Sequence, residues 1–232
     1  MAKKSHQKVC PSIELPSCSA CASTVRMREI AYHLMFFAKG NEAAKVVGLS
    51  DHTSIQEFAE SLELNYLNTF FDMDPRLDIS NPSDNWHNFA NILISSDVME
   101  HVMPPISKAF AGHFKVLQPG GNLILTTPYF HQSSYLEKYP HMSGYVVDDQ
   151  ANVFANGDNY ESLKIVDPVF HGGPGNTLEM RIVAPEIIRE GLEMAGFEDV
   201  VFNEVDIPEN GIIRSATNMG TITARKPLND HI

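Results

Sequence analysis

The stretch Asn91–Phe130 decides the fold, and it reads NILISSDVMEHVMPPISKAFAGHFKVLQPGGNLILTTPYF. Two short apolar runs, Asn91–Ser96 and Leu123–Thr127, lie near its ends. Between them, apolar side chains recur at helical spacing: Ile106, Phe110, Phe114 and Leu117. This pattern predicts two buried parallel strands that are joined by a right-handed crossover helix.

Proline and glycine residues mark the ends of the expected helix. Pro104 and Pro105 suit its start, because proline is tolerated in the first helical turn. Pro119, Gly120 and Gly121 are expected to end it before the second strand begins.

Two parts of this unit resemble class I S-adenosylmethionine-dependent methyltransferases. Asp97–Val102 (DVMEHV) and Phe114–Pro128 (FKVLQPGGNLILTTP) are similar to the turn after that family's fourth strand and to its R-x-L-K-P-G-G segment and fifth strand. Both halves stand in the right order and at the right spacing, which makes the combination specific. The resemblance implies an α/β fold: a Rossmann-like, mostly parallel sheet with a C-terminal antiparallel hairpin, helices on both faces, and S-adenosylmethionine as cofactor.

Length and composition predict one α/β domain with additions. The chain has 232 residues, of which 43% are hydrophobic, enough for a full core. We expect an N-terminal arm and helix over residues 1–40. A methyltransferase-like domain over residues 41–232 should follow, with a lid insertion at about 129–177.

The charge balance bears on partners and location. A net charge of −12 disfavours nucleic acid, whose binding depends on clustered Lys and Arg. The sequence contains no apolar run near the roughly 20 residues of a membrane span, and MAKKSHQK precedes no hydrophobic segment of a signal peptide. We therefore expect a cytoplasmic protein that acts on a small molecule; its oligomeric state does not follow from the sequence.

The N-terminal arm carries all the cysteines, Cys10, Cys18 and Cys21. An odd, crowded set does not suggest a disulfide framework. The Cys18-x-x-Cys21 turn resembles the openings of some methyltransferases and can hold zinc with Cys10 and His6 as further ligands, but a second paired turn is missing. A zinc site and a set of simple thiols both remain open, with the thiols favoured.

An amphipathic helix is predicted over Thr24–Lys39, where apolar residues alternate with Arg and Lys and Gly40 ends the pattern. Its expected role is to pack on the sheet, with His33 as a structural residue.

Ala44–Ser50 is predicted as the first strand, and the turn after it should meet the cofactor. In the methyltransferase family this turn is glycine-rich so that the ligand can approach the backbone. Here VVGLSDHTS retains only Gly48. Ser50, Asp51 and Thr53 are expected to cap the next helix, and Gly48, Ser50 and Asp51 to contact the cofactor. The alternative is a capping turn without a ligand.

Acidic residues follow the predicted second strand, Leu64–Phe71. Asp72, with Asp74 as second choice, is expected to accept hydrogen bonds from the ribose hydroxyls, although a solvated acidic turn is the alternative. Asp78, in a short RLDI strand, resembles the family's acidic position near the adenine. Because Pro75 leaves little room for a helix, this crossover should be abbreviated. The stretch from VVGLSD to PRLDI resembles bacterial glycan-associated methyltransferases with a similarly thin glycine motif.

The central strand ends in SSDVMEHV, where open α/β sheets place their ligands. Ser96 and Asp97 are expected to contact the cofactor. Glu100 and His101 are candidates for a general-base pair, for metal ligands, or for the floor of the pocket. In the second role the segment resembles metal-using methyltransferases that act on vicinal hydroxyls and on RNA ends.

The insertion after the fifth strand is predicted to form the lid. YVVDDQANVFANGDNY and SLKIVDPVF should form hairpin strands around the turn at Asn156-Gly157-Asp158. Phe170–Arg181 (FHGGPGNTLEMR) is its most distinctive part. His171 there is the preferred acid–base residue, with Glu179 nearby; a purely structural turn is the alternative.

The C-terminal part completes the sheet. A helix over Pro185–Ala195, ended by Gly196, should precede two strands, Phe197–Val205 and Thr221–Ala224, in an antiparallel hairpin. We therefore expect methyl transfer from S-adenosylmethionine to an oxygen or nitrogen of a small polar acceptor, with a sugar as one candidate. The alternative is a methyltransferase-like binding or scaffold protein that has lost catalysis.

Overall fold

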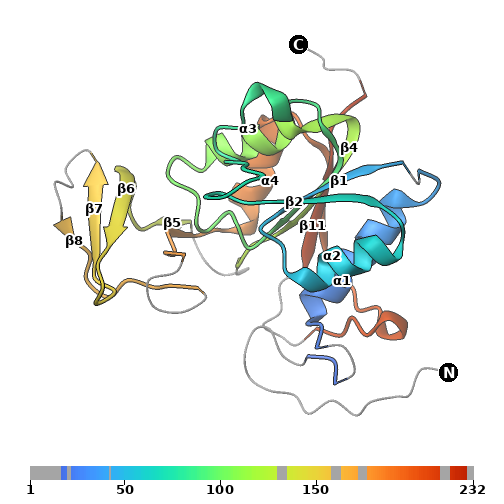
Figure 1. Cartoon of the computed structure of the whole chain (residues 1–232), viewed down its shortest axis with the longest axis horizontal. Helices are drawn as coiled ribbons and strands as arrows, with labels where there is room; N and C mark the ends of the chain where they lie inside the picture. Colours follow the sequence, from blue (N-terminus) through green and yellow to red (C-terminus); the bar gives the residue numbers. More distant parts are fainter. Residues whose placement is uncertain are drawn as a thin grey trace.

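The computed structural model describes residues 17–19, 22–41, 43–129, 135–157, 163–171, 177–214 and 220–228. A six-stranded sheet forms its centre, in the order β10-β11-β4-β3-β1-β2 (Figure 1). Its strands are β1 (Lys45–Leu49), β2 (Asn65–Thr69), β3 (Ala90–Ser96), β4 (Leu117–Thr126), β10 (Glu198–Asn203) and β11 (Thr221–Arg225). β1 to β4 pair in parallel, whereas β11 runs antiparallel to both β4 and β10. The predicted fold class is confirmed.

Helices cover both faces of the sheet. α1 (Val25–Ala38) and α2 (Thr53–Ser61) lie on one face, and α3 (Ser107–Val116) and α4 (Pro185–Met194) lie on the other (Figure 1). Side chains alternate along β3, so Ile92 and Ile94 pack with α1 whereas Leu93 packs with α3 and α4. No helix in the described ranges is long and apolar enough to cross a membrane.

The Pro-Gly-Gly segment lies inside β4 and not before it, which corrects the prediction. α3 ends at Val116, and Leu117 already pairs with Ala90 of β3. The next partners are Ile92 and Asn122, so residues 118–121 form an irregularity in the strand. Gly120 has a φ of +79°, a conformation that favours glycine.

The crossover from β2 to β3 is abbreviated, as predicted. Residues 70–89 are all described, and their only helix is the short 3-10 helix η1 (Asp84–Trp86). The predicted RLDI strand is absent from this stretch; Arg76 alone forms an isolated bridge, with Phe70. The capping prediction for α2 is also wrong, because His52 is the N-cap and its Nδ1 accepts from the Ser54 amide at 3.2 Å.

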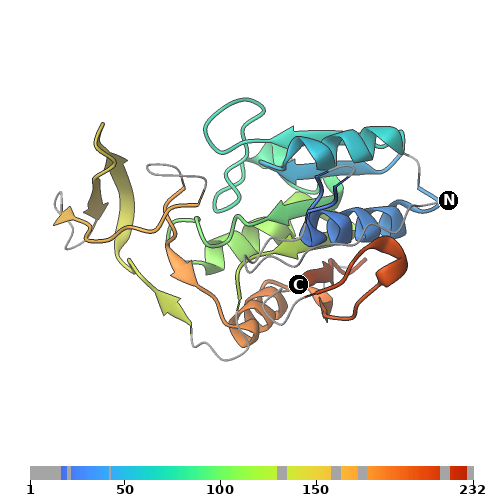
Figure 2. The same ribbon diagram turned by 90° about the horizontal axis from the view of Figure 1, so that it is seen from below.

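The insertion forms a separate three-stranded antiparallel sheet of β6 (Met142–Val147), β7 (Val153–Gly157) and β8 (Leu163–Lys164) beside the main body (Figures 1 and 2). β5 (Leu136–Glu137) pairs with β9 (Arg181–Ile182) at its base. A turn at 148–152 divides the segment that was predicted as one strand, because the Asp148 carboxylate accepts from the amides of Gln150 and Asn152. Asn156 and Gly157 belong to β7, and residues 158–162 lie outside the described part. A short 3-10 helix, η2 (Pro208–Asn210), lies between β10 and β11.

Candidate functional site

Glu100, His101 and His171, which we call the Glu100 cluster, converge from two distant segments. Glu100 and His101 follow β3, whereas His171 comes from the insertion. The Glu100 Oε1 atom lies 3.8 Å from His101 Nε2 and 3.6 Å from His171 Nδ1. The structure thus brings together the three residues that the sequence suggested for catalysis.

Glu100 is held in place from β4 and from the insertion. Its side chain is fully buried, and its Oε2 atom accepts a hydrogen bond from Thr127 Oγ1 at 3.0 Å. The amide of Met180 donates to its backbone carbonyl at 2.7 Å. Its Oε1 atom, by contrast, has no hydrogen-bond partner among the described residues. The carboxylate is therefore fixed on one side and open toward the imidazole rings.

Each histidine is oriented through the ring nitrogen that faces away from Glu100. His101 Nδ1 lies 2.9 Å from the carbonyl oxygen of Leu178, and His171 Nε2 lies 2.9 Å from Glu179 Oε2. Glu179 also forms an ion pair with Lys138. The two rings meet edge to face, with centroids 4.8 Å apart. Both remaining nitrogens face the open oxygen of Glu100.

The carboxylates on either side of His171 control its charge. The interaction with Glu100, followed by that with Glu179, raises the pKa of His171, although burial of the ring acts in the opposite direction. A raised pKa favours the charged imidazole at neutral pH, and a charged imidazole donates a proton and does not accept one.

A second group lies where β1 and β3 end. Arg26 of α1 forms an ion pair with Asp97, which we call the Arg26–Asp97 pair. Thr126 Oγ1 donates to Asp97 Oδ1 at 3.1 Å and lies 3.2 Å from Ser96 Oγ. Asp97 and Ser50 have φ values of +53° and +56°, so both strands end in a sharp change of direction.

Asp51 lies beneath this group and is 7% exposed. Tyr66 donates to its Oδ2 atom at 2.9 Å, and the Asn68 side chain bonds both its backbone N–H and its C=O at 3.0 Å. Its Oδ1 atom has no hydrogen-bond partner within the described ranges. Burial raises the pKa of Asp51 to about 7, against the opposing effects of the Tyr66 hydrogen bond and the Arg26 charge.

Gly48 leaves space for the side chains of Tyr66 and Asp51. A Cβ atom at Gly48 would lie 2.2 Å from the Tyr66 hydroxyl and 2.4 Å from Asp51 Oδ2. The only glycine of the thin motif is therefore explained by internal packing.

The charges at this end of the sheet fit S-adenosylmethionine. Its carboxylate matches the Arg26 guanidinium, and its ammonium group matches the Asp97 carboxylate. Five of the predicted cofactor residues stand at the neighbouring ends of β1 and β3: Gly48, Ser50, Asp51, Ser96 and Asp97.

The other predicted residues are more scattered. Asp72 and Asp74 are exposed in the turn after β2. Asp78 accepts from the amide and the hydroxyl of Ser80 at 2.9 and 2.7 Å, so it caps its own turn. Of the predicted zinc ligands, Cys10 and Cys21 lie outside the described residues and only Cys18 is described. The zinc site stays a prediction.

Sequence reasoning missed Arg26, Thr127 and Lys138. From the sequence, Arg26 is one of the basic residues on the polar face of the helix predicted over Thr24–Lys39. Two consecutive threonines, Thr126 and Thr127, at the carboxyl end of β4 could have indicated two separate groups of site residues, because consecutive residues of a strand point to opposite faces. Here one threonine holds Asp97 and the next holds Glu100.

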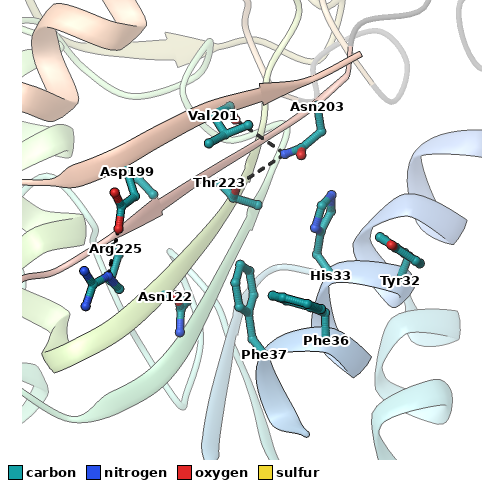
Figure 3. A pocket seen from close by; sticks show the side chains of 11 residues that line it. Tyr32, His33, Phe36, Phe37, Asn122, Asp199, Val201, Asn203, Thr223 and Arg225 are labelled. Carbon is teal, nitrogen blue, oxygen red and sulfur yellow. Dashed lines mark hydrogen bonds and ion pairs between the residues drawn. The ribbon is translucent and has the colours of Figure 1, made fainter. Parts of the chain in front are cut away.

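A groove of about 530 Å³ lies elsewhere, between α1 and the β10–β11 hairpin (Figure 3). Tyr32, His33, Phe36 and Phe37 line one side, and Asn203 bonds Thr223 at 3.2 Å on the other. Asn122, at its edge, lies four residues before the end of β4 at Thr126, or roughly 13 Å along a strand. The groove is therefore separate from the Glu100 cluster.

No protein-family model matches the chain, and no curated protein matches it in sequence. Solved structures do match. A SAM-dependent methyltransferase from Archaeoglobus fulgidus aligns with a TM-score of 0.51 at 12% identity, over 86% of this chain and 92% of that one. The glycopeptide N-methyltransferase MtfA, solved with S-adenosyl-L-methionine, aligns with 0.53 at 12%, over 87% and 95%.

The CurJ carbon methyltransferase aligns with a TM-score of 0.54 at 14% identity, over 91% of this chain and 56% of that one. At such identities the likeness concerns the fold. The chain has the fold of the class I S-adenosylmethionine-dependent methyltransferases.

Proposed function

We propose that this protein is an S-adenosylmethionine-dependent methyltransferase whose acceptor is an oxygen or nitrogen of a small polar molecule, such as a sugar. One observation carries the proposal. On a methyltransferase-like sheet, the consecutive residues Thr126 and Thr127 at the end of β4 contact Asp97 of the Arg26–Asp97 pair and Glu100 of the Glu100 cluster. Open α/β sheets bind their ligands at this edge.

The cofactor belongs on the side of the Arg26–Asp97 pair. Arg26 would bind its carboxylate and Asp97 its ammonium group, with Ser50 and Ser96 beside them. When bound there, S-adenosylmethionine supplies an electrophilic methyl group. Asp51 would not contact the cofactor through its charge. It would stabilise the turn after β1 through its hydrogen bonds with Tyr66 and Asn68.

The acceptor belongs on the side of the Glu100 cluster. Methyl transfer requires alignment and the removal of one proton as the new bond to carbon forms. Glu100 Oε1 fits the accepting role, because it is open and ordered, whereas the raised pKa of His171 favours a ring that already carries its proton. His101 and His171 would orient the acceptor. The insertion, about 129–177, supplies His171 and so serves as the acceptor-side lid.

One observation favours the alternative of a binding protein without catalysis. Gly48 is required by the packing of Tyr66 and Asp51, so its presence gives no independent sign of a bound cofactor. On this alternative the Arg26–Asp97 pair would be a structural ion pair.

Thermal unfolding with S-adenosylmethionine and S-adenosylhomocysteine tests the proposal. A ligand that binds only the folded state adds about 2.7 kcal/mol of stability at 100 times its Kd. Asp97→Asn should remove most of this stabilisation. Asp199→Asn is a matched control, because Asp199 also has a positive φ, +54°, and also pairs with an arginine, Arg225, at 3.0 Å. Stabilisation by neither ligand would favour the non-catalytic alternative.

A further inference from the structure

Three atoms of the Glu100 cluster face one another without forming hydrogen bonds. Three donor atoms face a common point: Glu100 Oε1, His101 Nε2 and His171 Nδ1. The two nitrogens lie 3.8 and 3.6 Å from the oxygen, beyond hydrogen-bond length, and all three ligand groups lie within 4.8 Å of one another. Two donors about 2.1 Å from one tetrahedral ion lie roughly 3.4 Å apart, so small rotations would bring these atoms to ligand distances.

The outer contacts of the histidines match those of metal-bound histidines. A ligating imidazole almost always donates its other N–H to a carboxylate or a backbone carbonyl, which sets its tautomer and its direction. His101 contacts the Leu178 carbonyl in this way, and His171 contacts the Glu179 carboxylate, each at 2.9 Å. Lys138 in turn holds Glu179. In their neutral forms, with the outer nitrogens protonated, both rings would present a lone pair toward Glu100.

The buried side chain of Glu100 is a second, independent indication of a bound ligand. Glu100 is fully buried, Thr127 occupies its Oε2 atom, and its Oε1 atom has no hydrogen-bond partner in the part of the chain that the structure describes. A buried polar oxygen that lacks a partner is costly unless a hydrogen-bond donor or a cation reaches it. The open oxygen points to the same place as the two open nitrogens.

We propose that Glu100 Oε1, His101 Nε2 and His171 Nδ1 bind one divalent transition-metal cation. Two imidazoles and one carboxylate suit zinc, cobalt, manganese or ferrous iron, whereas magnesium and calcium prefer all-oxygen sets. Three protein ligands leave at least one position open to a further oxygen donor.

The cation would also narrow the acceptor class. An oxygen bound to a divalent cation loses its proton more readily, and two adjacent oxygens chelate better than one. An acceptor with vicinal hydroxyl groups, such as a sugar diol, would therefore be selected. This consequence rests on the proposed methyl transfer, whereas binding of the cation does not. With the cation bound, Glu100 Oε1 would be a ligand and not the proton acceptor; the cation would lower the pKa of the acceptor hydroxyl, and its proton would pass to solvent.

Cobalt(II) is the most informative probe, because its visible absorption reports both binding and coordination geometry. The protein should carry no histidine tag and should be stripped with chelator. Cys10→Ser, Cys18→Ser and Cys21→Ser should be introduced together, so that thiols of the arm cannot bind the metal. We expect one cobalt per chain, displaced by zinc and not by a large excess of magnesium.

Variants assign the ligands. Glu100→Gln and His171→Ala should each weaken cobalt binding by more than 100-fold, and Glu179→Gln, which removes only an orienting contact, by roughly 10–100-fold. His141→Ala, at an exposed position on the same insertion, should leave affinity within twofold. If Glu100→Gln fails to fold, His101→Ala replaces it, since His101 is 16% exposed and is the safer change.

Cobalt bands that are absent, or that persist in Glu100→Gln and His171→Ala, would overturn the proposal and leave a hydrogen-bonded cluster. Cobalt that binds only when the arm cysteines are intact would also overturn it. The titration is done without S-adenosylmethionine, so cation binding without cofactor binding would refute the proposed function alone. Cofactor binding without cation binding would refute this inference alone.

Discussion

Asp51 and Glu100 are two buried carboxylates that follow neighbouring strands, and they behave differently. Each has one oxygen held by a hydroxyl group, from Tyr66 or Thr127, and one oxygen without a hydrogen-bond partner among the described residues. Around Asp51 burial dominates, so the pKa of its own carboxyl rises to about 7. Around Glu100 two imidazoles face the open oxygen, and the pKa of His171 rises.

The difference teaches that burial alone does not decide the role of a carboxylate. Where only a neutral hydroxyl and a distant charge oppose desolvation, the carboxyl tends to keep its proton. Where a basic group faces the carboxylate, as His171 faces Glu100, the pKa of that basic group rises, and the oxygen of Glu100 has no hydrogen-bond partner among the described residues. Asp51 is therefore suited to hold a turn, and Glu100 is suited to chemistry.

The largest expected effect follows from removing the open oxygen of Glu100. Glu100→Gln keeps the shape and the Thr127 contact, but it should lower kcat by roughly 10²–10⁴-fold with any acceptor that the protein methylates. Calorimetry should show unchanged affinity for S-adenosylmethionine. Asp51→Asn is the comparison and should lower kcat far less.

The opposite result would reverse these assignments. If Glu100→Gln kept full turnover while His171→Ala abolished it, His171 would be the proton acceptor, as the sequence first suggested. Unfolding midpoints of both variants must be measured beside the rates, because the contact between Glu100 and His171 joins the turn after β3 to the insertion.

The second prediction concerns stability and pH. The pKa of Asp51 is raised from 3.8 to about 7 in the folded protein, so folding is favoured below pH 4 and loses this contribution as the pH rises to 7. Asp51→Asn removes the cost of ionisation. The free energy of unfolding gained by the variant over wild type should therefore be larger at pH 8 than at pH 4, on the order of 4 kcal/mol, since each tenfold difference in proton affinity is worth about 1.4 kcal/mol.

Denaturant unfolding of wild type and variant across pH 4–8 measures this difference. Burial lowers the pKa of both His33 and His113 to about 4, so the wild type also responds to acid for other reasons. Subtracting the two curves cancels those contributions. A difference that stayed flat with pH would show that Asp51 is ionised throughout.

A third prediction tests why the turn has a glycine. Gly48→Ala should destabilise by about 1–3 kcal/mol, because the new methyl group would collide with the Tyr66 hydroxyl and Asp51. Adding Tyr66→Phe removes the nearest atom, so part of the loss should return. Thermal unfolding of the single and double variants gives the coupling. Strictly additive effects would mean that the glycine serves something other than Tyr66.

The parallel strand–helix–strand unit followed from the sequence, because periodic apolar runs report burial directly. The mostly parallel sheet with helices on both faces and a C-terminal antiparallel hairpin followed from the family resemblance, whereas the order of the strands was not predicted. The class of the central unit was clear from the Asn91–Phe130 stretch. The bulge in β4 was not clear from the sequence. A Pro-Gly-Gly segment is equally compatible with a turn between two elements and with an irregularity inside one strand. The turn at Asp148 was missed for a similar reason: its side-chain contacts depend on where the strand bends.

The site was predictable in its residue types and not in its pairings. Glu100, His101 and His171 carried chemical signals in the sequence, but their meeting depends on how the insertion docks against the turn after β3. Arg26 could not be assigned to Asp97, because the pair joins α1 to a strand end far along the chain. Long-range contacts of this kind leave no local pattern.

The smallest expected effect concerns Asp72, the predicted ribose acceptor. Asp72 is exposed after β2, which pairs with β1, the strand that precedes Asp51, so water competes for its hydrogen bonds. Asp72→Ala should therefore weaken S-adenosylmethionine binding by only about 0.5–1.5 kcal/mol, or roughly 2–13-fold, with kcat unchanged. Asp74→Ala, in the same exposed turn, is the control. Calorimetry that showed an equal loss for both would indicate a general effect of acidic charge. A loss for Asp72→Ala alone would support a specific contact and would place the ribose beside β2, on the far side of Asp51 from the Glu100 cluster.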